Sequence, residues 1–323
     1  MILLWGIASD GPLAQVRSAL LRAGAPMVFL DQQRVLQDRI VLSLDDGIRG
    51  SLHTGGQVLD LSAVTAVYVR PYDTLRMHAM QGAKPGGRRH QRAFAFDNAL
   101  TSWIELTPAL VVNRPSAMSS NHAKPYQLDL IRKAGFAVPD TLVTTDPDAI
   151  AGFWERHRQV IYKSVSGMRS IVTRLGDEHR DRLHDVSACP TQFQQCIDGT
   201  DYRVHVVGQA VFGCEIRSEA HDYRYPHRQL ADVSLHACDI PGDIADRCRQ
   251  LAASLGLAVT GIDLRRTPEG AWYCFEANPS PGFSYYEEST GQPISDAIAH
   301  VLMQGSVGGF AALGTKVADP VHA

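Results

Sequence analysis

Features of several protein classes are missing from this sequence of 323 residues. No apolar run approaches the roughly 20 residues that a membrane-spanning helix needs. The apolar run at residues 1–8 has no basic segment before it, so we expect a buried strand there rather than a signal peptide. The net charge of −3 gives no electrostatic argument for binding nucleic acid or an anionic membrane. We therefore expect neither of these partners.

Cysteine pairs are also missing. The six cysteines include no CxxC pair, which argues against a zinc site and against a disulfide framework. Isolated thiols are typical of a reducing compartment, so we expect a cytoplasmic protein. The hydrophobic content of 45% and the charged content of 20% are ordinary for a globular protein, and the length allows two or three domains.

The first third of the chain predicts a small doubly wound α/β domain, because it begins with a β–α–β pattern. The segment 78–92 is polar, basic and rich in glycine, and we expect a mobile loop there. A lid or a partner-contact segment is the alternative for this segment. The expected strands are 2–8, 27–30, 40–44, 50–53, 58–61, 66–71 and 110–113, and the expected helices are 10–23 and 93–106.

Arg70 stands at the end of one of these buried strands, directly before a proline. In doubly wound sheets, ligands bind at the carboxyl ends of the strands. Arg70 is therefore a candidate contact for an anionic substrate group. An arginine in a surface ion pair is the alternative, and the sequence leaves both open.

The rest of the chain alternates helices with strands and turns, without internal repeats. Residues 221–236 form a polar excursion rich in histidine and arginine, and the residues after 305 predict a frayed tail. The expected helices are 119–134, 146–157, 244–255 and 292–304, and the expected strands are 160–163, 171–173, 191–197, 202–207 and 210–217.

A hairpin at residues 259–279 carries the most specific chemical signal. If its turn is centred between Glu269 and Gly270, Asp263 lies opposite Glu276, and such partners have Cβ atoms about 5 Å apart. Asn278 follows Glu276 at the strand period of two and joins the same face. Few, hard oxygen ligands are typical of Mg²⁺, so the hairpin predicts a magnesium site. The alternative is a surface hairpin with solvated acids.

Weaker signals point to phosphate and nucleotide contacts. Lys163 ends a strand and precedes a loop of small residues, 164–170, whose backbone N–H groups could face a phosphate. The strand at 191–197 followed by Asp201 could pair with adenine and with ribose hydroxyls. Arg203 and Arg217 form an anion clamp if they face inward. For each of these residues, an ordinary solvated side chain is the alternative.

The order of these signals resembles the ATP-grasp ligases, and within them the RimK-type glutamate ligases and the graspetide (microviridin-type) peptide macrocyclases. The segment Asn113-Arg-Pro-Ser, then Lys124-Pro-Tyr-Gln-Leu, is similar to the macrocyclase pattern N-x-P followed by K-x-x-Q-L. Glu276-Ala-Asn-Pro-Ser-Pro-Gly is similar to the E-x-N-x-x-P-G metal motif of the family. The resemblance covers roughly residues 110–302.

The resemblance implies an α/β (α+β) chain with an ATP-grasp fold behind an N-terminal doubly wound domain. Residues 1–112 would form the N-terminal pre-ATP-grasp and substrate-recognition domain. Residues 113–197 would form the central ATP-grasp subdomain, and residues 198–305 the C-terminal subdomain with the magnesium site. Residues 306–323 would be a flexible tail.

The resemblance also implies a nucleotide site for ATP. Two lysines would contact the α- and β-phosphates, the loop would cover the phosphates, the strand would hold adenine and the aspartate would hold the ribose. The cofactor-binding residues would be Lys124, Lys163, Ser166, Gly167, Gln194, Gln195, Ile197, Asp201 and Arg203. Two departures from the family stand out, because the phosphate loop is short and poor in glycine, and a glutamine replaces the glutamate of many relatives.

By the same resemblance, Asp263, Glu276 and Asn278 would bind two Mg²⁺ ions, and Arg217 with Lys163 would act in catalysis. ATP would phosphorylate a carboxylate, and an amine or a hydroxyl would attack the acyl phosphate. Positioning and charge neutralisation suffice for this chemistry. A peptide crosslinked through its side chains is the first expected substrate, and Arg70 would contact it. The alternatives are ligation of small molecules, addition of amino acids, and a non-catalytic nucleotide-binding module; a homodimer is also consistent with the family.

Overall fold

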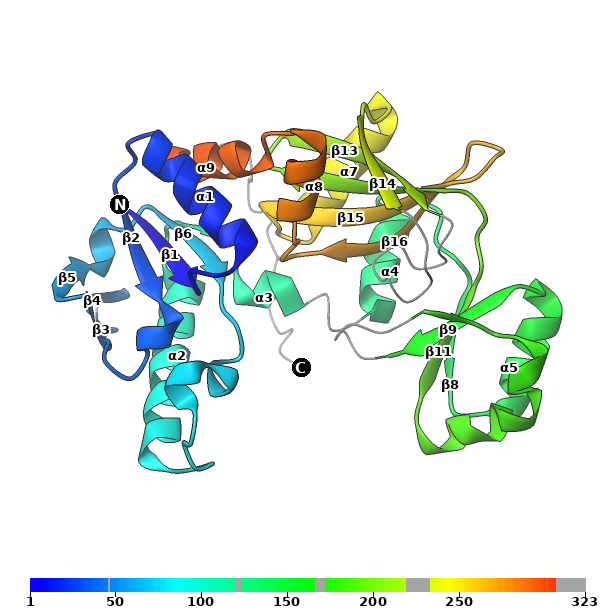
Figure 1. Cartoon of the computed structure of the whole chain (residues 1–323), viewed down its shortest axis with the longest axis horizontal. Helices are drawn as coiled ribbons and strands as arrows, with labels where there is room; N and C mark the ends of the chain where they lie inside the picture. The colour runs from blue at the N-terminus through cyan, green and yellow to red at the C-terminus, as the bar shows by residue number, and fades with distance from the viewer. Residues whose placement is uncertain (46, 120–123, 166–171, 219–232, 306–323) are drawn as a thin grey trace, which may run out of the picture. The chain divides into compact units, whose positions relative to one another are not determined.

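The structure is a computed structural model that describes residues 1–45, 47–119, 124–165, 172–218 and 233–305. It divides into two compact units (Figure 1). Unit 1 holds Met1–Pro115, Gly256–Ala258 and Ser295–Ala323. Unit 2 holds Ser116–Leu255 and Val259–Ile294. The three domain boundaries expected from the sequence stay a prediction.

Unit 1 contains the doubly wound arrangement that its β–α–β beginning predicts. Four parallel strands lie in the order β2-β1-β6-β7. The buried run in β1 pairs with β2 on one side and β6 on the other, so its side chains lie in the core. The bounds are β1 (Ile2–Gly6), α1 (Gly11–Arg22), β2 (Met27–Asp31), β6 (Ala66–Arg70), α2 (Arg88–Leu106) and β7 (Leu110–Val112).

Unit 1 also contains a separate antiparallel sheet of three strands, in the order β3-β4-β5. Gly55 and Gly56 both adopt positive φ in the turn between β4 and β5, a conformation that glycine adopts without strain. The bounds of the remaining elements of this unit are η1 (Gln32–Arg34), β3 (Arg39–Ser43), β4 (Arg49–Thr54), β5 (Gln57–Asp60), η2 (Leu61–Ala63), η3 (Thr74–Arg76), η4 (His78–Met80), α3 (Pro115–Met118, which reaches into unit 2) and α9 (Ile294–Gln304).

The loop expected over residues 78–92 is only partly correct. Helix α2 begins at Arg88, five residues earlier than expected, and η4 occupies His78–Met80. Arginine and glutamine are good helix formers, so their polarity indicated a solvated helix face rather than a loop. The apolar side of α2 buries Phe96, Leu100 and Trp103.

Unit 2 contains a small antiparallel sheet in the order β10-β9-β11-β8. One face of this sheet packs on α5, and Ile150, Phe153 and Phe193 lie in that core. The side chain of Asp146 caps the N-terminus of α5 by accepting the Asp148 N–H. The bounds are β8 (Thr141–Thr144), α5 (Pro147–His157), β9 (Val160–Ser164), β10 (Thr173–Arg174), η6 (Asp177–Ala188) and β11 (Thr191–Gln195).

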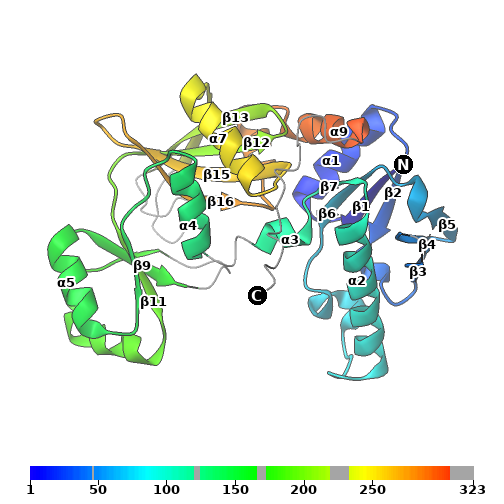
Figure 2. The same cartoon turned by 180° about the vertical axis from the view of Figure 1, so that it is seen from behind.

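The larger sheet of unit 2 is antiparallel and has the order β14-β13-β12-β15-β16. Helix α7 packs on β12 and β15, and α4 packs beside it on the edge strand β16 (Figure 2). The hairpin strands thus lie at one edge of the sheet. The bounds are α4 (Lys124–Lys133), β12 (Thr200–Val207), β13 (Ala210–Ser218), β14 (Val233–Cys238), α7 (Gly242–Ser254), β15 (Val259–Arg266), β16 (Trp272–Asn278) and α8 (Ser284–Thr290).

Three expectations fall wholly or partly outside the described residues: the phosphate loop, most of the excursion at 221–236, and the tail after 305. All six cysteines lie in described ranges and are free thiols, as expected. Across those ranges, no helix has the length and apolar character to cross a membrane.

Candidate functional site

The hairpin of β15 and β16 places Asp263 directly opposite Glu276, as the sequence predicted. The route to this pairing differs from the expected one. Near the turn, Arg266 lies opposite Trp272, so the turn is centred on Glu269 rather than between Glu269 and Gly270. A bulge between Asp263 and Leu264 then shifts the register by one residue and restores the predicted carboxylate pair.

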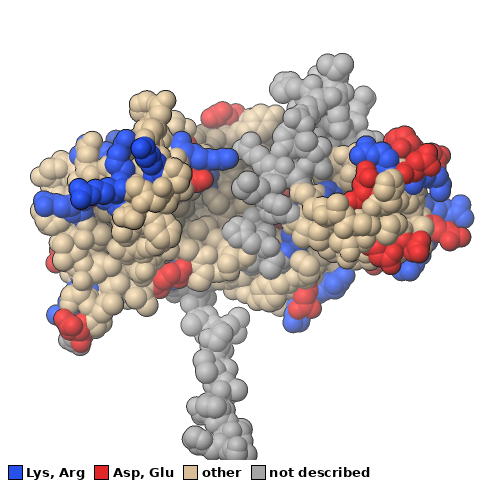
Figure 3. Space-filling view, turned by 90° about the horizontal axis from the view of Figure 1, so that it is seen from below, with Lys and Arg blue, Asp and Glu red and all other residues tan. Residues whose placement is uncertain are grey.

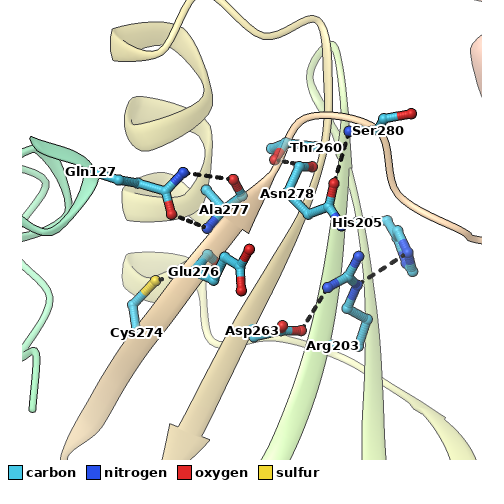
Figure 4. A network of polar contacts seen from close by, with 10 residues as sticks. All are labelled: Gln127, Arg203, His205, Thr260, Asp263, Cys274, Glu276, Ala277, Asn278 and Ser280. Carbon is cyan, nitrogen blue, oxygen red and sulfur yellow. Dashed lines mark hydrogen bonds and ion pairs between the residues drawn. The ribbon is translucent and has the colours of Figure 1, made fainter. Parts of the chain in front are cut away.

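Asn278 completes the set of oxygen donors on β16. It lies opposite Gly261, and its side-chain Oδ1 accepts the Ser280 N–H at 2.9 Å. Thr260 Oγ1 donates to the Asn278 backbone oxygen at 2.9 Å. Figure 4 shows Asp263 on β15, and Glu276 and Asn278 on the neighbouring strand β16. The backbone around the third predicted ligand is therefore held by two local hydrogen bonds.

Arg203 of β12 lies against the carboxylate pair. Its Nη1 is 2.6 Å from Asp263 Oδ1, and its side chain is only 7% exposed (Figure 4). A methyl group at Gly261 would collide with the guanidinium, so the absence of a side chain there makes room for the arginine. Of the two arginines expected to form an anion clamp, this one faces the predicted metal ligands.

His205 lies beside Arg203 in the same strand. Arg203 Nε donates to His205 Nε2 at 3.4 Å, and the histidine ring stacks edge-on against Tyr286 at 5.0 Å between centroids. Burial, and then the charge of Arg203, lowers the pKa of His205 well below its usual range. The imidazole is therefore neutral, which suits the acceptor role of Nε2. No pattern in the sequence indicated a role for this histidine.

The donor set fits a hard cation that keeps water and phosphate in its shell. The hairpin offers two carboxylates and one amide oxygen, which is the donor chemistry of Mg²⁺ rather than of zinc. Across the described ranges, no three His, Cys, Asp or Glu side chains gather into a metal cluster. A cation bound here would thus depend on further ligands from substrate or water.

Asp201 also has an arginine partner, and both side chains of this pair are partly buried. Arg265 Nε and Nη2 lie 2.7 and 2.8 Å from its two carboxylate oxygens, and Arg265 Nη1 donates to the Ile197 carbonyl. The arginine therefore links Asp201, near the start of β12, to Ile197, which follows strand β11 of the small sheet. Sequence reasoning missed Arg265, because only the pairing of β12 with β15 brings it to Asp201.

In the small sheet, Lys163 lies opposite Gln192, and Gln194 lies opposite Ile161. Strand alternation places Lys163 and Gln194 on one face, and Gln195 on the other. Gln194 is buried and its Nε2 donates to Thr141 Oγ1 at 3.0 Å. Gln195 Oε1 instead accepts the Asp140 N–H at 3.4 Å. The structure thus separates two glutamines that the sequence treated as equivalent.

Lys124 is the first residue of α4, and the same helix contacts β16. Gln127, one turn later, pairs with the backbone of Ala277 (Figure 4). The expected phosphate-loop residues Ser166 and Gly167 lie outside the described residues.

Arg217 does not join the other residues. The register pairs Tyr202 with both Glu215 and Leu264, whereas Arg203 pairs with Asp263. Alternation therefore puts Arg217 on the face opposite to the carboxylate pair. It is 66% exposed, and its Nε lies 2.6 Å from Glu215 Oε1. From the sequence, both arginines could face inward and form the clamp, and only the strand pairing places them on different faces.

Arg70 lies in unit 1, where Asp10 is its partner. Its Nε is 2.6 Å from Asp10 Oδ2, and Tyr72 donates to the same carboxylate at 3.1 Å. Asp10 also caps α1 by accepting the Leu13 N–H. The ion pair is largely buried, so Arg70 is not in the surface ion pair that was the alternative from the sequence.

Comparison with known proteins identifies the family. Residues 120–302 match the family model described as a RimK-like ATP-grasp domain. The chain is 24% identical over 287 residues to beta-citrylglutamate synthase B of Danio rerio, covering 83% of this chain and 64% of that protein. It is 25% identical over 235 residues to a probable alpha-L-glutamate ligase of Picosynechococcus, covering 66% of this chain and 74% of that protein.

Solved structures agree with the fold. The macrocyclase MdnC of Microcystis aeruginosa, bound to precursor peptide MdnA, has a TM-score of 0.80 and 23% identity, with 94% of this chain and 99% of that chain covered. The ATP-grasp ligase PsnB, complexed with a precursor variant, Mg and ADP, has a TM-score of 0.78 and 26% identity, with 94% and 98% covered. The predicted α/β ATP-grasp fold is therefore confirmed.

Proposed function

We propose, given that the chain belongs to the RimK-like ATP-grasp family, that it activates a carboxylate of a peptide as an acyl phosphate and joins it to an amine or hydroxyl. The ligase class, ATP dependence and ADP formation predicted from the sequence are confirmed at the level of the family. The substrate is the part that the proposal adds.

The nucleotide would contact residues of α4 and of both sheets of unit 2. Lys124 and Lys163 would neutralise the phosphates, and the strand that carries Gln194 would pair with adenine. Bound Mg²⁺, as two ions, would neutralise charge on the phosphates that transfer. Asp263 and Glu276 would hold the metal, with Asn278 as the third donor. Support comes from the matching motifs and from the opposed carboxylates.

Arg203, rather than Arg217, would stabilise the transferred phosphoryl group. It is the arginine that lies on the carboxylate face, and Asp263 holds its guanidinium in place before any ligand binds. A preorganised cation costs no reorganisation when charge develops in the transition state. The resemblance to the family implied this catalytic role for Arg217, and Arg217 is the alternative to Arg203.

A peptide substrate is supported by a basic surface on unit 1. Between Asp73 and Asp97 the sequence contains no carboxylate, and the cations there are exposed. We name this surface the basic segment; its members are Arg76, Lys84, Arg88, Arg89 and Arg92. Figure 3 shows lysine and arginine side chains gathered on this unit. A peptide that offers carboxylates for activation has the complementary charge.

The observation that carries the proposal is the Asp263–Glu276 pair, and ADP release tests it. The protein, ATP, Mg²⁺ and a carboxylate-rich peptide should release ADP, whereas Glu276→Gln should reduce the rate by at least about a hundredfold, since charge stabilisation of this kind is worth 10²–10³. The matched control is Glu287→Gln in α8. Equal rates in the wild type and Glu276→Gln would refute the metal assignment.

The second candidate is a ligase that adds glutamate to a small molecule or to a protein. The curated relatives favour it, because their names give beta-citrylglutamate and glutamate ligation. An assay in which the peptide is replaced by glutamate, together with either citrate or N-acetylaspartate, distinguishes the two candidate functions. ADP release that depends on glutamate and not on the peptide would select this candidate.

A further inference from the structure

Gln127 makes a contact that no proposed function requires by itself. It lies in α4, one turn after Lys124, and only 3% of its surface is exposed. Its Nε2 donates to the Ala277 carbonyl at 2.9 Å, and its Oε1 accepts the Ala277 N–H at 3.1 Å (Figure 4). A side-chain amide thus pairs with both backbone groups of one residue, as a neighbouring strand would.

This pairing satisfies an exposed sheet edge. β16 is the last strand of its sheet, so among the residues that the structure describes, one of its sides has no strand neighbour. Ala137 covers that side near the turn, where it bridges to Tyr273 and accepts the Cys274 N–H at 2.9 Å. Gln127 covers it at Ala277. Buried backbone groups without a partner are costly, so a replacement that cannot pair would leave two of them.

Ala277 lies between the two predicted metal ligands of β16, so the Gln127 contact also acts on the backbone that carries them. Its N–H belongs to the peptide plane shared with Glu276, and its carbonyl belongs to the plane shared with Asn278. Gln127 therefore fixes both planes that lead to the predicted metal ligands. Alternation also directs the Ala277 side chain into the core, where it is fully buried, and directs its two neighbours to the other face.

We propose that Gln127 is the positioning residue of the metal site, which orients Glu276 and Asn278 through Ala277. It also ties α4, which begins with the proposed phosphate ligand Lys124, to the strand that holds the metal. The inference rests on the proposed function, because it assumes that these two residues bind the cation. Groups that orient metal ligands typically change metal affinity 10- to 100-fold when they are removed.

The test measures metal affinity separately from stability and activity. Mn²⁺ binding by electron paramagnetic resonance, with a non-hydrolysable ATP analogue present, gives the metal dissociation constant. The variant Gln127→Met keeps the side-chain length and loses both hydrogen bonds. The matched control is Gln292→Met, because Gln292 also donates to a strand backbone of the same sheet, at Gly213.

Gln127→Met should weaken Mn²⁺ binding by about tenfold or more, with metal-free binding of the ATP analogue unchanged within about twofold, a difference of ~0.4 kcal/mol. Gln292→Met should bind Mn²⁺ as the wild type does. An unchanged Mn²⁺ dissociation constant in folded Gln127→Met would overturn the inference, even if its melting temperature fell. If that variant does not fold, Gln127→Glu, which keeps the acceptor and loses the donor, is held to the same criterion.

The failure of the proposed function would look different. In that case Glu276→Gln would bind Mn²⁺ as tightly as the wild type, and the inference would fall together with the metal assignment. A loss in Glu276→Gln without a loss in either Gln127 variant would overturn the positioning role alone.

Discussion

Three arginines that are buried or partly buried each form an ion pair with one aspartate. Arg203 pairs with Asp263, Arg265 with Asp201 and Arg70 with Asp10. The partners are at least 60 positions apart in sequence. Local patterns carry no information about such pairs, so the sequence identified acids and arginines but did not match them. Removing one member of such a pair leaves a buried charge without compensation.

Exchanging the two clamp arginines for glutamine should separate their roles. Arg203→Gln should lower the rate of ADP release by about a hundredfold, because a preorganised charge near the phosphates is lost. Arg217→Gln should stay within about threefold, ~0.7 kcal/mol, of the wild type. Mn²⁺ binding should persist in Arg203→Gln, since Asp263 loses a competitor for its oxygens. A larger rate loss in Arg217→Gln than in Arg203→Gln would contradict the assignment.

His205 should make the stability of the protein depend on pH. Its folded pKa is lowered, so below about pH 6.5 the unfolded chain binds a proton that the folded one does not. Stability is therefore present above that pH and is lost as the pH falls, by up to ~1.4 kcal/mol per pH unit. Two titratable side chains contact His205 in the structure, Arg203 through a hydrogen bond and Tyr286 through its ring.

Urea unfolding of His205→Gln, which keeps an acceptor for Arg203, isolates this effect. Between pH 6.5 and 5, the free energy of unfolding should fall less steeply for the variant than for the wild type. Parallel curves for the two proteins would show that His205 is charged in the folded state or does not contribute.

Among the elements, the hairpin of β15 and β16 shows which structural features an alternating sequence pattern can predict and which it cannot. The alternation of Asp263, Glu276 and Asn278 predicted one face, and the pairing of the carboxylates is confirmed. The position of the turn shifts the strand register by one residue from the predicted one, and the bulge shifts it back by one residue before the carboxylate pair. Bulges depend on packing against neighbouring elements rather than on local propensity, so the pattern could not reveal this one.

The basic segment at the start of α2 gives a prediction at this scale. Lys84→Glu combined with Arg88→Glu should raise the KM for a carboxylate-rich peptide about tenfold, ~1.4 kcal/mol, and leave kcat unchanged. The effect should weaken as salt is added, because exposed charges are screened. The matched control is Lys133→Glu in unit 2, since Lys133 is an exposed lysine outside the segment. A KM equal to that of the wild type would exclude this surface from peptide binding.

At the scale of the whole molecule, the order of motifs was more informative than any one of them. Lysines, a glutamine strand and an acidic hairpin in sequence order predicted the family, and the family model and the shared fold confirm it. The sequence could not assign Arg217 and Arg203 to opposite faces, because that requires the register of β12 with both neighbours. It also could not show the Gln127 contact, which joins residues 150 positions apart.

The most direct test of the central claim is the melting temperature of the wild type and Glu276→Gln with a non-hydrolysable ATP analogue, with and without Mg²⁺. At a hundredfold excess over the dissociation constant, a ligand that binds only the folded state stabilises it by about 2.7 kcal/mol. We expect the melting temperature of the wild type to rise only when both Mg²⁺ and the analogue are present, and to rise clearly less in Glu276→Gln. Equal rises in the two proteins, or a wild-type rise that survives EDTA undiminished, would contradict a metal-dependent nucleotide site at this hairpin.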